Sequence, residues 1–290
     1  MDLQTKFTFF LLKLINAKKL ADRSVLKPKR SKKFVYPHRL KKYRSDEFLA
    51  QNRHVITFSE NIKKEAGKHI VFLHGGAYTA EEKPGHWWLI EQLVKSLGCK
   101  ISFIQYPLAP EHNYRQTHEM LLLAYTELTQ KSPKDTFYLL GDSAGGGLVL
   151  AFAQTLRDQK FTKQPQKLAL LSPWLDLSMS NPEVENLESR DLLLSAKTLA
   201  TCGKWFAGET DVKSPVLSPL YGNMNDLISI AVFVGTHEIF LPDCRLLKQK
   251  IQSSNTKLYY REYEGMQHDW ILFPIKERDE LLNELITYFS

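Results

Sequence analysis

The sequence predicts an α/β fold in which a mostly parallel central sheet is covered by helices on both faces. Three observations carry this prediction. After residue 50, short β-branched or aromatic runs alternate with longer helical patterns. The runs in the middle of the chain are almost wholly apolar, as parallel strands buried on both faces are. With 290 residues, 43% of them apolar, the chain can also bury a large core.

The predicted elements follow one another in a regular order. Seven strands are expected, at His54–Phe58, His69–Leu73, Lys100–Gln105, Thr136–Leu140, Lys167–Leu171, Ile228–Val234 and Lys257–Tyr263. Helical patterns separate most of them or close the chain, at Trp87–Leu97, Gln116–Thr129, Ala144–Gln159, Ser195–Phe206, Pro242–Ile251 and Glu277–Phe289. Residues 176–214 interrupt this order with a long connection, and in a compact domain such a connection is usually functional.

The first 50 residues differ from the rest in charge. They hold 14 Lys or Arg against 4 Asp or Glu, a net charge of +10, whereas the other 240 residues carry a net charge of −3. Residues 3–20 predict one amphipathic helix, and 27–42 predict an extended connector. We expect the apolar stripe of that helix, Phe7 to Leu11, to be buried on the body. The expected organisation is a basic segment at 1–50 and a body at 51–290 that carries the insertion at 176–214.

The strongest chemical signal is the string Gly141-Asp142-Ser143-Ala144-Gly145, which lies between an expected strand and an expected helix. This is the context of a G-x-S-x-G nucleophile elbow, in which a tight turn exposes the serine hydroxyl at the helix N-terminus. Chymotrypsin-like proteases also use a G-D-S-G-G string, but they are all-β and usually disulfide-linked. A helix follows Ser143 and the three cysteines are far apart, so the sequence favours the elbow.

A second string, His74-Gly75-Gly76, directly follows the expected strand His69–Leu73. Acyl transfer needs backbone donors aimed at the tetrahedral oxyanion, and glycines allow the backbone to present them. An H-G-G loop after an early strand, with an elbow downstream, is typical of the oxyanion loop of α/β-hydrolases.

The base and the acid are sought in the order serine, acid, histidine. His268 is the only histidine after Glu238, and it follows the last expected strand, so it is the expected base. Glu238 and Asp243 compete for the acid. We favour Glu238 because it lies closer to the strand end, while Asp243 is expected to cap the next helix.

These strings, together with Tyr106-Pro107-Leu108-Ala109-Pro110-Glu111-His112, resemble the hormone-sensitive-lipase-like family of α/β-hydrolases, of the bacterial carboxylesterase type. The similarity runs from about residue 69 to 275. It implies Ser143 as nucleophile, Glu238 as acid and His268 as base. It also implies an oxyanion hole formed by the N–H groups of Gly75, Gly76 and Ala144, and a helical cap formed by the segment 1–50 and the insertion.

The sequence departs from the family pattern at three positions. The acid is Glu238 where aspartate is more frequent, Pro107 stands where arginine is common, and Ala77 replaces a frequent third glycine. The first departure leaves the choice between Glu238 and Asp243 open.

The activity expected is a serine carboxylesterase that hydrolyses short- to medium-chain acyl esters through an acyl-enzyme, with no metal or organic cofactor. A deacetylase or amidase would use the same triad, and a non-catalytic ligand-binding protein of the same fold is the alternative outside the enzymes.

The expected partner is a small-molecule ester. Nucleic-acid binding is not expected, because the body is slightly acidic and no recognised motif is present. Contact between the basic segment and an anionic membrane, and a homodimer, are kept as alternatives. The odd, scattered cysteines and the absence of a long apolar run favour a cytoplasmic protein, with the inner membrane face as the alternative location.

Overall fold

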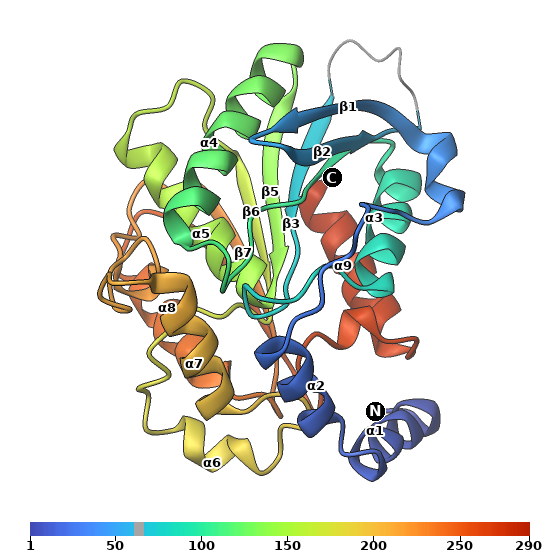
Figure 1. Ribbon diagram of the computed structural model, residues 1–290, viewed down its shortest axis with the longest axis vertical. Helices are drawn as coiled ribbons and strands as arrows, with labels where there is room; N and C mark the ends of the chain where they lie inside the picture. The colour runs from blue at the N-terminus through green and yellow to red at the C-terminus, as the bar shows by residue number, and fades with distance from the viewer. Residues whose placement is uncertain (61–66) are drawn as a thin grey trace.

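The computed structural model describes residues 1–60 and 67–290. One eight-stranded sheet forms its centre (Figure 1), in the order β1-β2-β4-β3-β5-β6-β7-β8. The strands are β1 (Arg44–Ala50), β2 (Arg53–Phe58), β3 (Lys68–Leu73), β4 (Lys100–Ile104), β5 (Thr136–Asp142), β6 (Lys167–Leu171), β7 (Ser229–Gly235) and β8 (Lys257–Tyr263). The six strands from β4 to β8 in this order are parallel, and β1 and β2 add an antiparallel edge. The predicted fold class is therefore confirmed.

Helices cover both faces of the sheet, as its apolar strands require. On one face, α3 (Pro84–Leu97) and α9 (Glu277–Phe289) share a buried apolar cluster with the strands. On the other face, α4 (Tyr114–Lys131), α5 (Ser143–Asp158) and α8 (Leu241–Gln252) form a second cluster. Figure 1 shows these two layers on opposite sides of the sheet.

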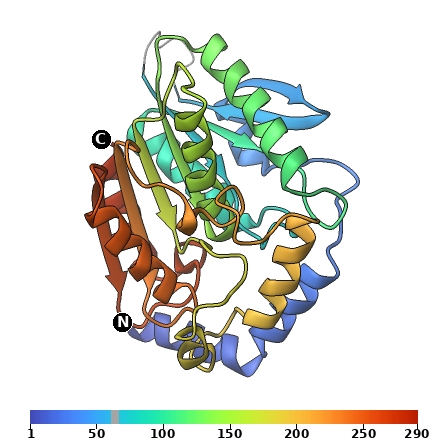
Figure 2. The same cartoon turned by 90° about the vertical axis from the view of Figure 1, so that its left-hand side faces the viewer.

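Four helices gather beyond the carboxyl ends of the parallel strands, although they come from two distant parts of the chain (Figures 1 and 2). They are α1 (Leu3–Leu14), α2 (Ala17–Leu26), α6 (Val184–Glu188) and α7 (Ala196–Ala207). Helix α2 packs against α7. The N-terminal segment and the insertion thus lie together over the carboxyl ends of the parallel strands, near the turn that contains Ser143.

The N-terminal segment differs from its prediction in three ways. The connector expected to be extended over 27–42 ends in a short 3-10 helix, His38–Tyr43. The single helix expected over residues 3–20 is broken at Asn16, which has a left-handed φ of 53° and accepts a hydrogen bond from the Lys19 N–H as the cap of α2. The stripe expected to be buried is mostly exposed: Phe7 is 61% and Phe10 60% exposed. Helix α1 packs on the body through its opposite face, where Thr5 and Phe9 are buried.

Strand β1 was not expected from the sequence. Its residues are mostly charged or polar and only Ala50 is buried, so no apolar run marks it. It pairs with β2 alone, at the sheet edge, where an exposed strand can carry charged side chains. Charged residues are typical of such edges, but they also suit a loop.

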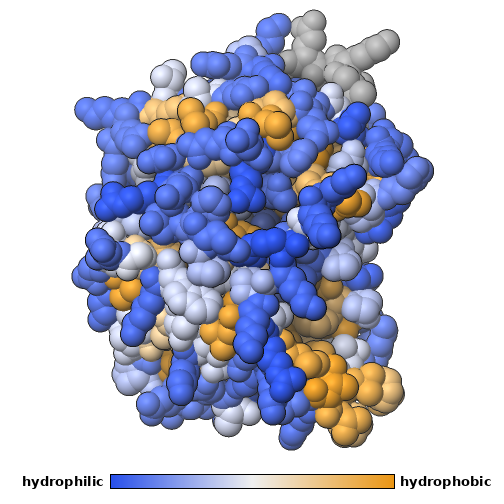
Figure 3. All heavy atoms as spheres, in the orientation of Figure 1, coloured by the Kyte–Doolittle hydropathy of each residue, from blue (hydrophilic) through white to orange (hydrophobic). Residues whose placement is uncertain are grey.

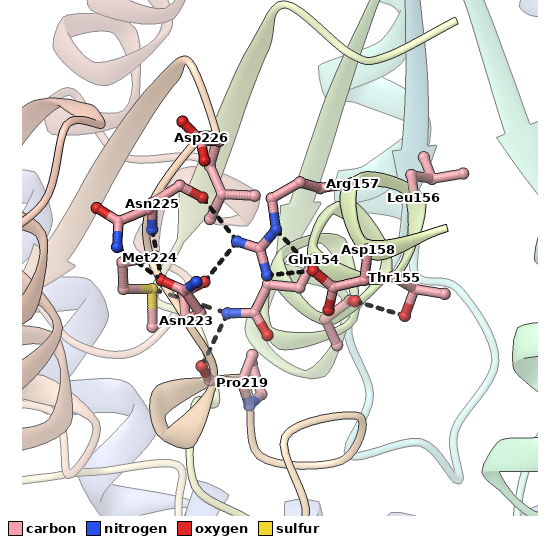
Figure 4. Close-up of polar contacts among 12 residues, drawn as sticks. Gln154, Thr155, Leu156, Arg157, Asp158, Pro219, Asn223, Met224, Asn225 and Asp226 are labelled. Carbon is pink, nitrogen blue, oxygen red and sulfur yellow. Dashed lines mark hydrogen bonds and ion pairs between the residues drawn. The ribbon is translucent and has the colours of Figure 1, made fainter. Parts of the chain in front are cut away.

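Helix α5, which begins at Ser143, is tied at its far end to the chain that leads into β7 (Figure 4). The Gln154 amide donates to the Pro219 carbonyl at 3.1 Å, and the Arg157 guanidinium donates to the carbonyls of Asn223 and Asn225 at 2.6 and 2.8 Å. Gly222 passes so close to Gln154 that a Cβ there would lie 2.2 Å from the amide oxygen. These contacts fix the end of α5 that lies away from the site.

Across the described parts of the chain, every helix is too short or too polar to cross a bilayer.

Candidate active site

Ser143 stands at the turn between β5 and α5, with a left-handed φ of 52° that non-glycine residues rarely adopt. The turn is possible because its neighbours are glycines. A Cβ on Gly145 would lie 2.0 Å from the Leu73 carbonyl oxygen, and one on Gly141 would lie 2.4 Å from the Gly145 carbonyl oxygen. Strand, turn and helix backbones therefore touch, and the hydroxyl of Ser143 is held at the strand end.

Ser143, His268 and Glu238 form a continuous chain of contacts. The Ser143 Oγ lies 2.9 Å from His268 Nε2, and His268 Nδ1 lies 2.7 Å from Glu238 Oε2. With the imidazole neutral, the serine hydroxyl donates to Nε2 and the Nδ1–H donates to the carboxylate. All three residues are buried. This is the arrangement that a general base needs to accept the serine proton.

Glu238 is held in place by two further donors. Its Oε1 accepts hydrogen bonds from the Gly235 N–H at 2.5 Å and from the Ser172 hydroxyl at 2.8 Å. These contacts leave Oε2 facing His268.

Asp243 makes a different contact from the one expected. It lies inside the first turn of α8, whose cap is Phe240, so its predicted role as a helix cap was wrong. Its Oδ1 accepts from the Asn181 amide at 2.8 Å, which ties α8 to the insertion. The structure brings Glu238, and not Asp243, to His268.

The loop after β3 lies against the elbow. A Cβ on Gly75 would lie 2.4 Å from Asp142 Oδ2 and 2.9 Å from the Ser143 Cβ, so only glycine allows this approach. Although burial opposes the charged form of Asp142, the charge of His86 lowers its pKa, and the nearby Gly75 backbone contributes in the same direction. Ala144 is the second residue of α5, where helix geometry leaves its N–H without an intrahelical acceptor.

Two residues that the sequence analysis gave no role support this loop. Asp142 Oδ2 lies 3.0 Å from His86 Nε2, and His86 Nδ1 accepts from the Lys83 N–H at 2.8 Å. Although burial opposes the charged form of His86, the Asp142 charge raises its pKa. Asp142 was visible inside the elbow string, but nothing in the sequence connects it with His86, 56 residues earlier.

A cavity of about 380 Å³ opens above Ser143. Its walls are mainly apolar and come from both distant segments: Ala21 and Val25 of α2, Leu194 before α7, and Leu199 of α7. The loop after β3 and the segment 268–273 complete it. A short acyl chain attached to Ser143 would find apolar contacts on several sides.

The N-terminal segment is also joined to the body by polar contacts. The Arg30 guanidinium donates to the Ala109 carbonyl and to the Glu111 carboxylate, both at 2.6 Å, and to the Thr79 carbonyl. Glu111 thus anchors its loop to the N-terminal segment. Asp176 anchors its own loop in the insertion by accepting from Ser178 and Tyr221.

Within the described residues, no three His, Cys, Asp or Glu side chains are grouped in a way that could hold a metal ion. The site brings together a serine, a histidine and a carboxylate below an apolar cavity.

Comparison with known proteins gives the same fold. A family model for the alpha/beta hydrolase fold matches residues 70–272. The chain is 29% identical to an acetyl-hydrolase of Streptomyces hygroscopicus over 208 residues, 71% of this chain and 69% of the relative. It is 30% identical to an esterase of Acinetobacter venetianus over 219 residues, 74% of this chain and 72% of the relative. A solved structure named as a hormone-sensitive lipase from a metagenome library has a TM-score of 0.83 at 24% identity, with 100% of this chain and 98% of the other covered.

Proposed function

Since this chain belongs to the α/β-hydrolase family, we propose that it is a serine carboxylesterase that hydrolyses short- to medium-chain acyl esters. The observation that carries the proposal is the buried contact chain from Ser143 through His268 to Glu238, below an apolar cavity. The relatives named esterase and acetyl-hydrolase support the same class of reaction.

The reaction has two steps. In the first, the Ser143 hydroxyl attacks the ester carbonyl while His268 Nε2 takes its proton, and the alcohol then leaves with that proton. In the second, water attacks the acyl-enzyme with the same base, and Ser143 regains its proton as the carboxylic acid forms. Glu238 holds the imidazole tautomer and stabilises the imidazolium. Each step needs Nε2 to be free of a proton at its start.

The tetrahedral oxyanion would be held by backbone N–H groups of the loop after β3 and of the helix start. We assign this role to Gly75, Gly76 and Ala144.

The segment 1–50 and the insertion at 176–214 would act together as a cap that selects the substrate. Helices α2 and α7 pack on each other and both line the cavity, which supports this role. An acetyl ester would contact little of the cap, whereas a longer acyl chain would reach it.

The test is hydrolysis of p-nitrophenyl esters from acetate to palmitate, with fluorophosphonate labelling. We expect Ser143→Ala to remove turnover and labelling without loss of fold. Ser24→Ala, which changes another serine of the same cavity, should keep both. Turnover retained by Ser143→Ala would exclude the proposed nucleophile, and a wild-type chain that does not label would be a ligand-binding member of the fold.

Deacetylation is a second candidate reaction, favoured by the relative named acetyl-hydrolase. It would use the same residues on a smaller acyl group. A rate that is highest on acetate and falls steeply with chain length, together with turnover of acetylated sugars or amines, would favour it over a general esterase.

We further propose that helix α1 rests on an anionic membrane surface. Its outward face is apolar, with Leu3 86%, Phe7 61% and Leu14 69% exposed, and Figure 3 shows apolar side chains gathered over this part of the molecule. Lys6 and Lys13 flank this face at helical spacing. An apolar stripe bordered by lysines is the pattern of a helix that lies in a lipid interface. A cytoplasmic protein would meet such a surface at the inner membrane face.

Flotation with lipid vesicles tests this second proposal. The chain should float with vesicles that contain phosphatidylglycerol and less with phosphatidylcholine alone. The double variant Phe7→Ser, Phe10→Ser should bind about 100-fold more weakly, since burial of each such side chain contributes roughly 1.5 kcal/mol or more. Leu49→Ser, Leu123→Ser, which changes apolar residues that are also exposed but lie on other elements, is the control. If the wild type is a dimer in solution and the Phe7, Phe10 variant is a monomer, this face binds a second copy of the chain and not a membrane.

A further inference from the structure

Asp269 places a second carboxylate on the imidazole of His268. It follows His268 in the chain and has a left-handed backbone, with φ of 51° and ψ of 38°. Its N–H donates to the Ser172 hydroxyl at 3.3 Å. Its Oδ2 lies 3.0 Å from His268 Nε2, the same nitrogen that Ser143 Oγ contacts at 2.9 Å. The side chain is only 13% exposed and lines the cavity.

Within the described part of the chain, the second oxygen of this carboxylate makes no hydrogen bond that would stabilise the fold. Asp269 Oδ1 is buried and, among the described residues, has no hydrogen-bond partner. Buried polar atoms usually have a hydrogen-bond partner, so this unpaired oxygen needs an explanation. The carboxylate has one contact, and that contact is the reacting nitrogen.

His268 therefore has a carboxylate at each ring nitrogen. Glu238 faces Nδ1 at 2.7 Å and Asp269 faces Nε2 at 3.0 Å. Only the imidazolium can donate from both nitrogens at once. Although burial favours the neutral ring, Asp269 first and then Glu238 raise the pKa of His268 well above its ordinary value.

The other ionisable groups around this pair act in both directions: the carboxyl groups favour retention of the shared proton, whereas the basic side chains of Lys83 and His86 oppose it. Burial raises the pKa of Asp269, and the charges of Asp142 and Glu238 act in the same direction, while the imidazolium opposes them. The groups that face the pair or line the cavity come from six elements or loops: Asp22, Lys83, His86, Asp142, Asp191 and Glu238. Three of them, Asp142, Asp191 and Glu238, are buried carboxyl groups, which makes loss of the shared proton harder.

We propose that Asp269 holds the proton of His268 in the free enzyme and thereby sets the pH above which the site can act as a base. This inference rests on the proposed esterase activity. The proton stays on Nε2, shared with Asp269 Oδ2, until the pair loses it to solvent; only then can Nε2 accept the Ser143 proton. During turnover the same carboxylate stabilises the imidazolium that forms after attack.

The pH dependence of kcat/KM on p-nitrophenyl acetate tests this role. In Asp269→Asn the acidic limb should move down by roughly one pH unit, because one opposite charge at this distance shifts a pKa by about that much or more. Relative to its own plateau, the variant should then be up to tenfold more active than the wild type on that limb. Asp22→Asn removes a carboxyl group from the same cavity, away from His268, and should leave the limb in place.

A second variant and a second measurement keep the result interpretable if Asp269→Asn does not fold. Asp269→Gly suits the left-handed backbone and should shift the limb in the same way. NMR titration of His268 in the Ser143→Ala background reads the imidazole directly, without turnover. The inference would be overturned if neither the acidic limb nor the NMR pKa of His268 moves in Asp269→Asn or Asp269→Gly. In that case a wild type that is active and labelled would still support the esterase proposal. An inactive, unlabelled wild type would instead remove the esterase proposal.

Discussion

The glycines around Ser143 show why the proposed nucleophile could be predicted from a short string. At Gly145 and Gly147 a side chain would collide with another backbone segment: a Cβ on Gly147 would be 2.0 Å from the Trp174 carbonyl oxygen, and one on Gly145 would be 2.0 Å from that of Leu73. The requirement is local in sequence but is imposed by distant strands. A run of glycines after an apolar strand therefore indicates that other backbone segments pack closely against it, although the run does not show which segments these are.

The two candidate acids can be separated by matched substitutions. Glu238→Gln removes the charge that faces Nδ1 and should lower kcat on p-nitrophenyl acetate by roughly 10³-fold or more, as loss of the triad carboxylate does elsewhere. Asp243→Asn should change kcat by only about twofold, since Asp243 is bonded to Asn181. If Asp243→Asn loses as much activity as Glu238→Gln, the assignment of the acid is wrong.

His74 makes the fold sensitive to acid. It is fully buried, stacks on Tyr106 with ring centres 4.6 Å apart, and its Nδ1–H donates to the Gly75 carbonyl at 2.6 Å. Burial lowers its pKa to about 3. Between pH 6.5 and about 3 the unfolded chain binds a proton at this position that the folded chain does not, so stability falls as the pH falls.

We therefore expect His74→Phe to flatten that decline by about 1.4 kcal/mol per pH unit below 6.5. Urea unfolding between pH 7 and 4.5 measures it. The same substitution at the exposed His38 should leave the slope unchanged, and an unchanged slope in His74→Phe would show that another group controls the acid limit.

The contact between Asp269 and His268 could not be predicted from the sequence. The sequence shows that Asp269 follows His268, but in an extended chain adjacent side chains point to opposite sides. Its contact with Nε2 exists because the backbone turns left-handed at that residue. Asp142 and His86 were missed for a related reason, since their contact joins two elements. Patterns within one segment do not report such pairs.

At the scale of elements, the strands and helices of the body could be predicted because burial leaves a period in the sequence. Strands β2 to β7 are mostly apolar runs, and all strands from β2 to β8 lie within two residues of their predicted bounds. Strand β1, the break between α1 and α2, and the short helix α6 were not predicted, and none of them leaves such a period. Strand β1 is a charged edge, and the break between α1 and α2 depends on the conformation of Asn16 alone.

The predicted face of α1 was wrong for a physical reason. An amphipathic pattern states which side chains share a face, but not whether that face meets the body or another surface. In α1 the apolar side chains Phe7 and Phe10 face outward, and the body receives Thr5 and Phe9.

The anchor of α5 shown in Figure 4 predicts a stability effect that is separate from catalysis. Arg157→Ala removes two donors to the carbonyls of Asn223 and Asn225, and should lower the free energy of unfolding by about 1–3 kcal/mol. Urea denaturation measures this. Because Arg157 lies three to four turns from Ser143 along α5, kcat should stay within about twofold of the wild type. A large loss of kcat with unchanged stability would contradict the structural role.

At the scale of the whole molecule, the basic segment 1–50 and the slightly acidic body contribute to the site in different ways. The basic segment supplies none of the residues in the Ser143, His268 and Glu238 contact chain, yet α2 forms a wall of the cavity above Ser143. The insertion, far from this segment in the sequence, supplies another wall. Substrate selection is thus expected to depend on two segments that meet only in the folded chain, and no single stretch of sequence could show this.

A truncation separates these contributions. Removal of residues 1–26 takes away α1 and α2, and with them the Ala21 and Val25 side of the cavity. A butyryl chain would lose apolar contacts worth about 1.5 kcal/mol, so KM for p-nitrophenyl butyrate should rise roughly tenfold. KM for the acetate should change much less, because an acetyl group stays near Ser143. Removal of residues 1–15 alone keeps α2 and Asn16, its cap, and should leave both KM values unchanged, although vesicle binding is lost. If KM rises equally for the two esters in the longer truncation, α2 supports the fold as a whole and does not select the acyl chain.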